Sequence, residues 1–288
     1  MAITAQQVKE LRDKTGAGMM DCKKALVEAD GDFDKAIEIL RKKGASVAAK
    51  RAERSANEGL VKTVILNDHS TGVMLEVNCE TDFVAKSNDF IEFADYVMDV
   101  IIKNQPKSVT DLLELEHDGK IVKNYLLDIT GKIGEKIEIS RFVIENADDG
   151  LVADYVHHGS KLGVLIRIDN TGDQKENFLT TAKELAMQVA AMKPLYVYRE
   201  DVPEDVLTKE KEIYKEVAKK EGKPEQILDR IAEGKLKKYF QENCLFEQTF
   251  IKDSTKTVGD LMKELNSKFS TDAKIKLFHR FHLSDEQK

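Results

Sequence analysis

Apolar residues near the start of the chain recur at the three- and four-residue spacing of short amphipathic helices. Thr4 can cap a first helix that the stretch TGAG ends, and a second helix is expected over MMDCKKALVEA. Asp32 can cap a third helix, and Gly44 is expected to end it. The pattern therefore predicts a bundle of three helices over residues 1–45, followed by a basic helical connector over residues 46–57.

The middle of the chain carries one pattern of apolar residues twice. Residues 58–82 align without a gap with residues 149–173, at an offset of 91 positions. Identical residues coincide at several places, namely Gly59 with Gly150, Leu60 with Leu151, Val61 with Val152, Gly72 with Gly163, Val73 with Val164, and Asp82 with Asp173. In each copy two apolar runs flank a polar turn, and a helical pattern follows. The repeat predicts a core made of two copies of one antiparallel sheet-plus-helix unit.

The two copies differ in the loop that joins the second strand to the helix. Beyond this loop the offset falls to 88, where Phe90 aligns with Phe178. The first copy has CETDFVAKSNDF where the second has NTGDQKENF, so the first copy adds Phe83, Val84 and Ala85. Because the same joint forms in the second copy without these residues, we expect that the fold does not require them. Phe83 is therefore a candidate contact residue in a surface loop.

Residues 204–243 differ from the expected core in their pattern of charged and apolar residues. Charged residues occupy about every second position, and a sparse apolar stripe runs through them, consisting of Ile213, Val217, Ile227, Ile231 and Leu236. Two helices so poor in apolar residues cannot build a core of their own, which predicts a protruding antiparallel hairpin with its break at EGKP. Such a hairpin can be a solvated surface feature or an arm for self-association or partner binding, and the pattern leaves both open.

The whole pattern predicts an α+β fold. Between the copies, VTDLLELEHDGKIVKNYLLDITGKIG is expected to form two helices and EKIEISRFVIENA a strand. A helix and a strand that follow the hairpin should rejoin the preceding sheet. The expected parts are a helical domain over 1–45, a connector over 46–57, a first core half over 58–147, a second core half over 148–203 and 244–288, and the hairpin over 204–243.

Composition and charge narrow the function classes. The formal net charge of -7, with no Trp and only seven Tyr, argues against nucleic acid as a direct partner. A mean hydropathy of -0.42 and the lack of a long apolar run predict no membrane span. Three Cys that lie far apart fit reduced structural thiols, and MAITAQQVKELRDK lacks the basic-then-apolar order of an export signal. These features predict a cytoplasmic protein.

Candidate catalytic and metal-binding motifs are weak. His157 and His158 are adjacent near the end of an expected strand, where neighbouring side chains point in different directions, and no clustered Cys accompanies them. TGAG has neither a preceding strand nor the GK[ST] of a phosphate-binding loop, and no GxSxG occurs. The basic stretch from Arg41 to Arg54 fits the solvated face of a linker helix. We therefore expect no covalent catalysis, no bound metal and no cofactor.

Met19 and Met20 begin the second expected helix directly after a glycine turn. At most one of two adjacent side chains can point into so small a core, so the other is expected at the surface. The flexible thioether of Met suits an adaptable contact, which makes this helix start a candidate partner-binding surface.

Several stretches resemble a known family. VKELRDKTGAGMMDCKKAL near the start and LEVNCETDFVAKSNDF after the first hairpin resemble the two signature motifs of bacterial elongation factor Ts. HHGSKLGVL and AAMKP resemble that family's second core half, and the order of parts matches over essentially the whole chain, with an N-terminal bundle of the ubiquitin-associated type. After FHRFHL the sequence runs to Lys288, whereas some members carry a further C-terminal helix that lies on their partner. The resemblance does not extend to a contact from such a helix.

The resemblance implies a guanine-nucleotide exchange factor for the translational GTPase elongation factor Tu. Members of the family bind the GDP form of that GTPase and displace Mg²⁺ and GDP, so that GTP can rebind. The residues that the resemblance assigns to partner contacts are Thr81, Asp82, Phe83 and Val84 in the Mg²⁺-dislocating motif, Lys9, Arg12, Met19 and Met20 in the N-terminal domain, and His158 and Gly159 in the second core half. The hairpin resembles the family's dimerisation arm.

Two other function classes stay open from the residues alone. A ribosome- or RNA-associated module would use the basic connector, and its affinity would fall steeply with salt. Net acidity and the shortage of stacking aromatics count against it. An adaptor that binds ubiquitin-like proteins would use the N-terminal bundle alone and would leave the duplicated core without a role.

Overall fold

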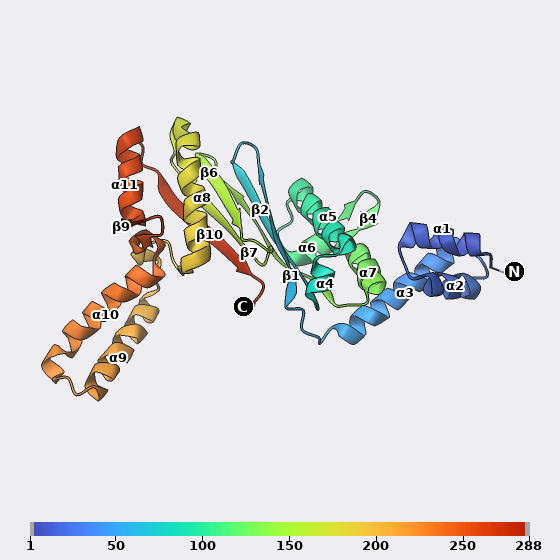
Figure 1. The fold of residues 1–288 in the computed structure, drawn as a ribbon, viewed down its shortest axis with the longest axis horizontal. Helices are drawn as coiled ribbons and strands as arrows, with labels where there is room; N and C mark the ends of the chain where they lie inside the picture. Colours follow the sequence, from blue (N-terminus) through green and yellow to red (C-terminus); the bar gives the residue numbers. More distant parts are fainter. Residues whose placement is uncertain (1–2, 286–288) are drawn as a thin grey trace.

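The molecule is elongated, with a helical bundle at its N-terminal end and a helical hairpin that projects near the other end (Figure 1). The computed structural model describes residues 3–285, so residues 1–2 and 286–288 of the expected first and last parts lie outside the described residues. Between the bundle and the hairpin lie two units of sheet and helix. The expected α+β architecture of bundle, duplicated core and hairpin is confirmed.

The N-terminal bundle has its own small core. Its helices are α1 (Ala5–Thr15), α2 (Met19–Glu28) and α3 (Phe33–Arg51). As expected, the side chains of Thr4 and Asp32 cap α1 and α3 by accepting backbone N–H groups. The buried side chains between the helices are Val8, Leu11, Cys22, Ala25, Leu26, Ala29 and Ala36.

The predicted end of the third helix at Gly44 is wrong, because α3 continues to Arg51 and includes residues 46–51, the first half of the expected connector. Within a helix, glycine costs about 1 kcal/mol relative to alanine, so an interior glycine needs a packing reason. An added Cβ at Gly44 would stand 2.6 Å from the carbonyl oxygen of Leu127 in α7 (Val122–Ile133). Gly131 of α7 lies directly across this crossing, where a Cβ added to Gly131 would stand 3.0 Å from Gly44 Cα. Close helix packing therefore overrides the local propensity.

The first core half contains a three-stranded antiparallel sheet in the order β1-β2-β5. Its elements are β1 (Glu58–Leu66), β2 (Thr71–Cys79), α4 (Asp82–Ala85), α5 (Asn88–Asn104), α6 (Val109–Leu113), β3 (Glu116–His117), β4 (Lys120–Ile121), α7 and β5 (Ile137–Asn146). The two helices and the strand expected after α5 are confirmed as α6, α7 and β5, but the short β3–β4 pair between the helices was not predicted. Helices α5 and α7 cover one face of the sheet, over a core that includes Val73, Leu75 and Val77.

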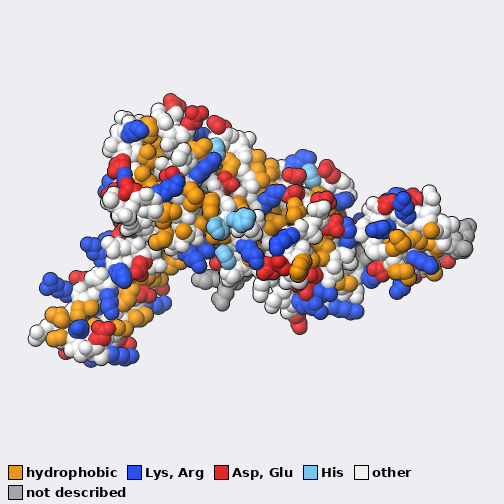
Figure 2. All heavy atoms as spheres, viewed as in Figure 1, with side chains coloured by type: hydrophobic (Ala, Val, Ile, Leu, Met, Phe, Trp, Pro, Cys, Tyr) orange, Lys and Arg blue, Asp and Glu red, His pale blue; other side chains and the backbone are white. Residues whose placement is uncertain are grey.

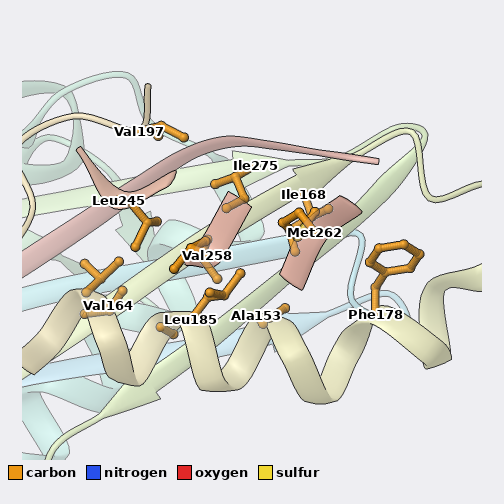
Figure 3. Close-up of a cluster of buried hydrophobic side chains, with 14 of the residues drawn as sticks. Ala153, Val164, Ile168, Phe178, Leu185, Val197, Leu245, Val258, Met262 and Ile275 are labelled. Atoms are coloured by element: carbon orange, nitrogen blue, oxygen red, sulfur yellow. The ribbon is translucent and has the colours of Figure 1, made fainter. Parts of the chain in front are cut away.

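The second core half repeats this plan, with the strand order β10-β7-β6. Its elements are β6 (Gly150–Val156), β7 (Leu162–Asp169), α8 (Lys175–Met192), β8 (Thr249–Phe250), β9 (Asp253–Thr257), α11 (Val258–Phe269) and β10 (Lys274–His282). Helix α11 and strand β10 rejoin the sheet as expected. Figure 3 shows the core of this half, where side chains of β7, β10, α8 and α11 meet. The hairpin, α9 (Glu204–Lys220) and α10 (Leu228–Asn243), is inserted between α8 and α11.

The two halves contact each other through equivalent groups, which confirms the duplication. The Val61 N–H donates to the carbonyl oxygen of Ser160 at 2.6 Å, and the Val152 N–H donates to that of His69 at 2.7 Å. Each residue of the first bond lies 91 positions from its equivalent in the second bond. In each half, therefore, the hairpin turn binds the first strand of the other half.

Two glycines at equivalent positions let the sheets approach. A Cβ added to Gly72 would stand 2.5 Å from Val152 Cγ1, and one added to Gly163 would stand 2.5 Å from Val61 Cγ1. These contacts are again reciprocal, because Val61 and Val152 are equivalent residues. The side chains between the two sheets are Val61, Met74, Ala147, Val152, Leu165, Phe281 and Leu283. The core is therefore a four-layer arrangement, with helices outside and the two sheets inside.

Candidate partner-binding surfaces

The segment after β2, expected as a loop, is the one-turn helix α4. The Thr81 hydroxyl caps it by accepting from the Val84 N–H at 3.4 Å, and donates to Glu135 Oε1 at 2.8 Å. The Thr81 N–H donates to Glu135 Oε2 at 3.0 Å. At the other end of α4, the Ser87 hydroxyl donates to the Val84 carbonyl oxygen at 2.8 Å and also caps α5. Both ends of this turn are therefore held in place.

Phe83 lies at the tip of α4 and is 83% exposed, more than the other large apolar residues of the described part. The two neighbouring residues of the insertion behave differently, because Val84 and Ala85 pack against the core of the first half. Of the three added residues, Phe83 alone has no role in packing. An exposed aromatic side chain on an anchored turn is a candidate for contact with an apolar surface of a partner.

Asp82 is already paired in this structure. Its carboxylate accepts from Lys86 Nζ at 2.8 Å, one helical turn away. The bond to Lys86 and, less strongly, the charge of Lys161 hold the pKa of Asp82 below its usual range. The Asp82 carboxylate is therefore charged, and it faces Lys86 of the same turn.

Glu80, just before the turn, links it to α3. The Glu80 carboxylate accepts from Arg51 Nη1 at 2.7 Å, from Arg54 Nη1 at 3.0 Å and from the Lys136 N–H at 2.6 Å. Partial burial alone would raise the pKa of Glu80, but the Lys136 N–H and the two arginines together lower it to about 2. We did not predict this contact. The only sequence signal is that the equivalent residue in the second copy, Thr171, is uncharged.

The cysteines are buried and unpaired. Burial raises the pKa of Cys79 to about 12 and that of Cys244 to about 11, and it raises the pKa of Cys22 as well. The Cys79 thiol donates to the Thr81 carbonyl oxygen at 3.2 Å, beneath the anchored turn. These thiols are poor nucleophiles and serve the packing.

The second-half motif lies in the turn between β6 and β7. His158 and Gly159 are exposed there, and Gly159 has a positive φ of 88°. His157 is held by its own strand, since its Nδ1 lies 2.8 Å from the Tyr155 hydroxyl. Lys161 reaches Glu58 at the start of β1 at 2.6 Å. The structure thus brings this turn close to the first-half motif, although the two motifs lie far apart in the sequence.

The predicted N-terminal contact residues are on the surface of α1 and α2. Lys9 and Arg12 are exposed, and Met19 and Met20 are 55% and 63% exposed. Both methionines are therefore free for contacts, where we expected at least one. Val27, two turns beyond Met20 on the same face of α2, is 58% exposed and extends this surface. Its spacing of seven residues from Met20 could have revealed it.

The α1–α2 surface is separate from the α4 turn. The bundle occupies one end of the molecule and α4 lies on the first core half (Figure 1). Apolar side chains of the bundle are visible at the right of Figure 2. The candidate contact residues therefore form two surfaces, one on the bundle and one where the core halves meet, with α3 running between them.

The hairpin exposes part of its apolar stripe. Ala218, Leu228 and Ala232 are buried between its helices, and Lys215 pairs with Asp229 across them at 2.5 Å. Ile213, Val217 and Ile227 are exposed instead, as the apolar side chains among charged ones at the lower left of Figure 2 illustrate. Their exposure is compatible with either of the two roles considered for the hairpin.

Residues 3–285 contain no group of three or more His, Cys, Asp or Glu side chains placed to hold a metal ion. Within the same range, no helix has the length and apolarity needed to cross a bilayer.

The fold and its surfaces are typical of a modular binding protein, with exposed apolar residues on a helical bundle and on an anchored turn of a duplicated core. Residues 80–285 match the family model described as Elongation factor TS. The chain is also 46% identical to the Elongation factor Ts of Chloroherpeton thalassium, over 99% of each chain. It is 46% identical to that of Chlorobium phaeobacteroides over 98% of each chain, and 44% identical to that of Clostridium botulinum over 97% of this chain and 92% of the relative. The chain therefore belongs to the elongation factor Ts family, a family of factors in protein biosynthesis.

Proposed function

We propose that this chain is a guanine-nucleotide exchange factor in translation elongation. It binds elongation factor Tu in the GDP form and displaces Mg²⁺ and GDP, so that GTP can rebind. Family membership supports the role in elongation. The observation that carries the exchange step is Phe83, an 83% exposed aromatic residue on an anchored turn that one of two otherwise equivalent halves adds.

Exchange requires binding energy that acts on the nucleotide-free partner more than on the nucleotide-bound partner. By linkage, a factor that weakens GDP binding is itself bound more weakly when GDP is present, by the same ratio. Burial of a Phe side chain is worth roughly 1.5–3 kcal/mol, and about 1.4 kcal/mol corresponds to tenfold in affinity. Phe83 alone can therefore supply about one to two decades of weakening, and the other contacts supply the rest.

In this proposal Phe83 enters an apolar pocket beside the partner's Mg²⁺ site, while Asp82 disturbs polar groups around the metal. The bonds of Thr81 to Glu135 support this role, because a turn that is already ordered loses little entropy on binding. Asp82 would exchange its present partner, Lys86, for groups of the GTPase. Val84 supports the turn from beneath.

The remaining contacts complete the proposal. Lys9, Arg12, Met19 and Met20 bind the partner from the N-terminal domain, and His158 and Gly159 bind it from the second core half. The proposed domains are the bundle at 1–45, which α3 joins without a break to the connector at 46–57, the core halves at 58–147 and at 148–203 with 244–288, and the hairpin at 204–243. The hairpin offers its exposed Ile213, Val217 and Ile227 for self-association. The protein acts in the cytoplasm, without covalent chemistry, a cofactor or direct contact with nucleic acid.

The test is Phe83→Ala, with GDP release from elongation factor Tu followed by a fluorescent GDP analogue. The substitution should slow stimulated release by about tenfold or more, since it removes the burial energy of one Phe. The melting temperature should stay near that of the parent protein, because Phe83 is exposed. Leu195→Ala is the matched control, because it truncates another well exposed apolar residue, at 62%, and should leave release unchanged.

Unchanged release by Phe83→Ala with intact binding would refute the wedge. If the parent chain does not stimulate release at all, the exchange function itself is wrong. If the chain instead binds RNA, with an affinity that falls steeply with salt, the alternative of a ribosome- or RNA-associated module would be favoured.

A further inference from the structure

We propose that α3 is a rigid strut that fixes the distance between the α1–α2 surface and the α4 turn, and that Glu80 is the positioning residue at its far end. The inference deepens the proposed function, on which it rests, by assigning a role to residues that need not touch the partner. It stands on three contacts along one helix.

The first contact is at the N-terminal end of the strut. Ala36 of α3 is fully buried in the core of the bundle, together with Leu11 of α1 and Leu26 of α2. The helix then runs without interruption to Arg51. Because α3 packs with α1 and α2 and then continues as one helix, its direction fixes how α1 and α2 are oriented relative to the core halves.

The second contact is the crossing of α3 with α7. Gly44 and Gly131 allow the backbones to touch, since an added Cβ at Gly44 would stand 2.6 Å from the Leu127 carbonyl oxygen. Backbone atoms cannot rotate away as side chains can, so this crossing fixes both the separation and the angle of the helices. Arg41 and Asp128 form an ion pair at 3.8 Å beside it.

The third contact is the carboxylate of Glu80, which accepts hydrogen bonds from Arg51, the last residue of α3, from Arg54 just beyond it, and from the Lys136 N–H just before β5. Glu80 directly precedes Thr81, the cap of the turn that bears Phe83. The Glu80 side chain thus joins the arginines at the end of α3 to the residue that directly precedes the cap of the α4 turn. The second core half has no counterpart, because Thr171 stands at the equivalent position.

The rest of the junction between bundle and core is loosely filled. A cavity of about 200 Å³ lies beside the crossing, lined by charged side chains that include Lys43, Lys120 and Asp128. Apolar side chains also meet at this junction, among them Ala48 of α3 and Leu127 of α7. The backbone crossing and the Glu80 contact add fixed geometry to that packing.

A strut of this kind matters for a protein that binds one partner through two surfaces. Once one surface binds, a fixed spacing presents the other at a high effective concentration and in the right orientation. A small displacement of the Phe83 turn would weaken its action without weakening the first contact.

The first experiment uses the chain without a partner. Spin labels on Lys24→Cys in α2 and Lys103→Cys in α5, both exposed positions, report the distance between bundle and core. The native cysteines are buried and should not react. A narrow distance distribution should broaden in Gly44→Ala and in Glu80→Gln. A distribution that is broad in the parent, or that neither substitution changes, would overturn the strut.

The second experiment measures GDP release from elongation factor Tu at saturating factor. Glu80→Gln should lower the maximal rate by about tenfold, through misplacement of the turn, while the concentration for half-maximal rate changes little. Glu38→Gln is the matched control, because it removes an exposed carboxylate of the same helix, paired with Lys42, far from the turn.

A double substitution separates positioning from general damage. In a Phe83→Ala background, Glu80→Gln should have almost no further effect, because Glu80 acts through the placement of Phe83. Independent, multiplicative losses would contradict the assignment. If the parent chain does not stimulate GDP release, the proposed function fails, whereas the distance measurement still decides on the strut.

Discussion

The two core halves solve the same structural problem at the same joint in different ways. After its second strand, the first half has Glu80 bound by two arginines, a capped turn and an exposed Phe83. The second half has Thr171, which is fully buried, followed by the short turn Gly172–Gln174. Both joints lead into a long helix that covers the sheet. The shared plan therefore provides stability, and the residues that differ are the ones to examine for function.

The halves also differ in where each was extended. In the first half the added residues, Phe83 to Ala85, follow the second strand. In the second half the added part is the α9–α10 hairpin, which follows the long helix. Neither extension disturbs the reciprocal bonds between the halves, such as those of Val61 and Val152. Duplication of a stable unit thus leaves each copy free to acquire a different surface.

The largest expected effect comes from removing this difference. Replacing CETDFVAKSNDF by NTGDQKENF gives the first half the joint of the second. The loss of Phe83 and of the anchored turn together should slow stimulated GDP release by at least about a hundredfold, the upper end of what burial of one Phe supplies. A fluorescent GDP analogue in stopped flow measures the rate.

The matched control for this exchange of loops is a second chimera that restores Phe83 alone within the short joint. It should recover little activity, since the bonds of Thr81 and Glu80 that place the turn are missing. Circular dichroism should show both chimeras folded. Full activity of the short-joint protein would show that the difference between the halves has no part in exchange.

Most of the fold was predictable because it depends on local patterns. The repeat of apolar runs and glycines revealed the duplication, and comparison of the copies marked Phe83 as unneeded by the core. Thr4 and Asp32 cap their helices through bonds within a few residues, which a sequence displays directly. The β3–β4 pair was missed because strands of two residues have no periodicity to detect.

The features that sequence reasoning predicted wrongly or missed are mostly contacts between segments that lie far apart in the chain. Gly44 is a normal helix terminator by propensity, and only the approach of Gly131, far along the chain, explains why α3 continues through it. The bonds of Glu80 to Arg51 and Arg54 join segments that no local pattern connects. The candidate turn could thus be singled out from sequence, but the hydrogen-bond network that anchors it could not.

A second prediction breaks the symmetry between the sheets. Gly163→Ala places a Cβ 2.5 Å from Val61 Cγ1 and 3.1 Å from Met74 Sδ, so overpacking should cost about 1–3 kcal/mol of the free energy of unfolding. Adding Val61→Ala should return part of this loss, because the new methyl group then occupies the vacated space. Urea unfolding of the two single variants and the double variant measures the coupling.

The equivalent pair supplies the control, since Gly72→Ala places its Cβ 2.5 Å from Val152 Cγ1. It should behave in the same way and be relieved by Val152→Ala. Additive losses in both cycles would mean that the reciprocal contacts do not determine the packing of the halves.

A third prediction concerns pH and the charged joint. The pKa of Glu80 is about 2 in the folded chain, below its ordinary value, because the Lys136 N–H and the two arginines outweigh its partial burial. A lowered folded-state pKa stabilises the protein above the unfolded-state pKa, and this contribution disappears as pH falls through the folded value. Glu80→Gln should therefore reduce the free energy of unfolding by about 1.5–3 kcal/mol at pH 6, on the scale of a charged hydrogen bond.

The difference between parent and Glu80→Gln should shrink between about pH 4.5 and pH 2, because the unfolded chain takes up the proton at Glu80 near pH 4.5 and the folded chain only near pH 2. Glu38→Gln, on the exposed face of α3, should show a much smaller difference at every pH. Chemical unfolding at a series of pH values measures both. A difference that is constant across this range would mean that the Glu80 charge does not stabilise the joint.

The smallest expected effect is at the joint of the second half. Thr171 Oγ1 is buried and has no hydrogen-bond partner among the described residues, so this threonine carries an unsatisfied hydroxyl group. Thr171→Val keeps the shape and removes the hydroxyl, which should stabilise the chain by up to about 1 kcal/mol. Thr81→Val, in the first half, should instead destabilise it, because that hydroxyl caps α4 and donates to Glu135. Opposite signs in thermal unfolding would show that one joint is built for packing and the other for a fixed turn, whereas a loss of stability in Thr171→Val would indicate a bound water or another partner at that hydroxyl.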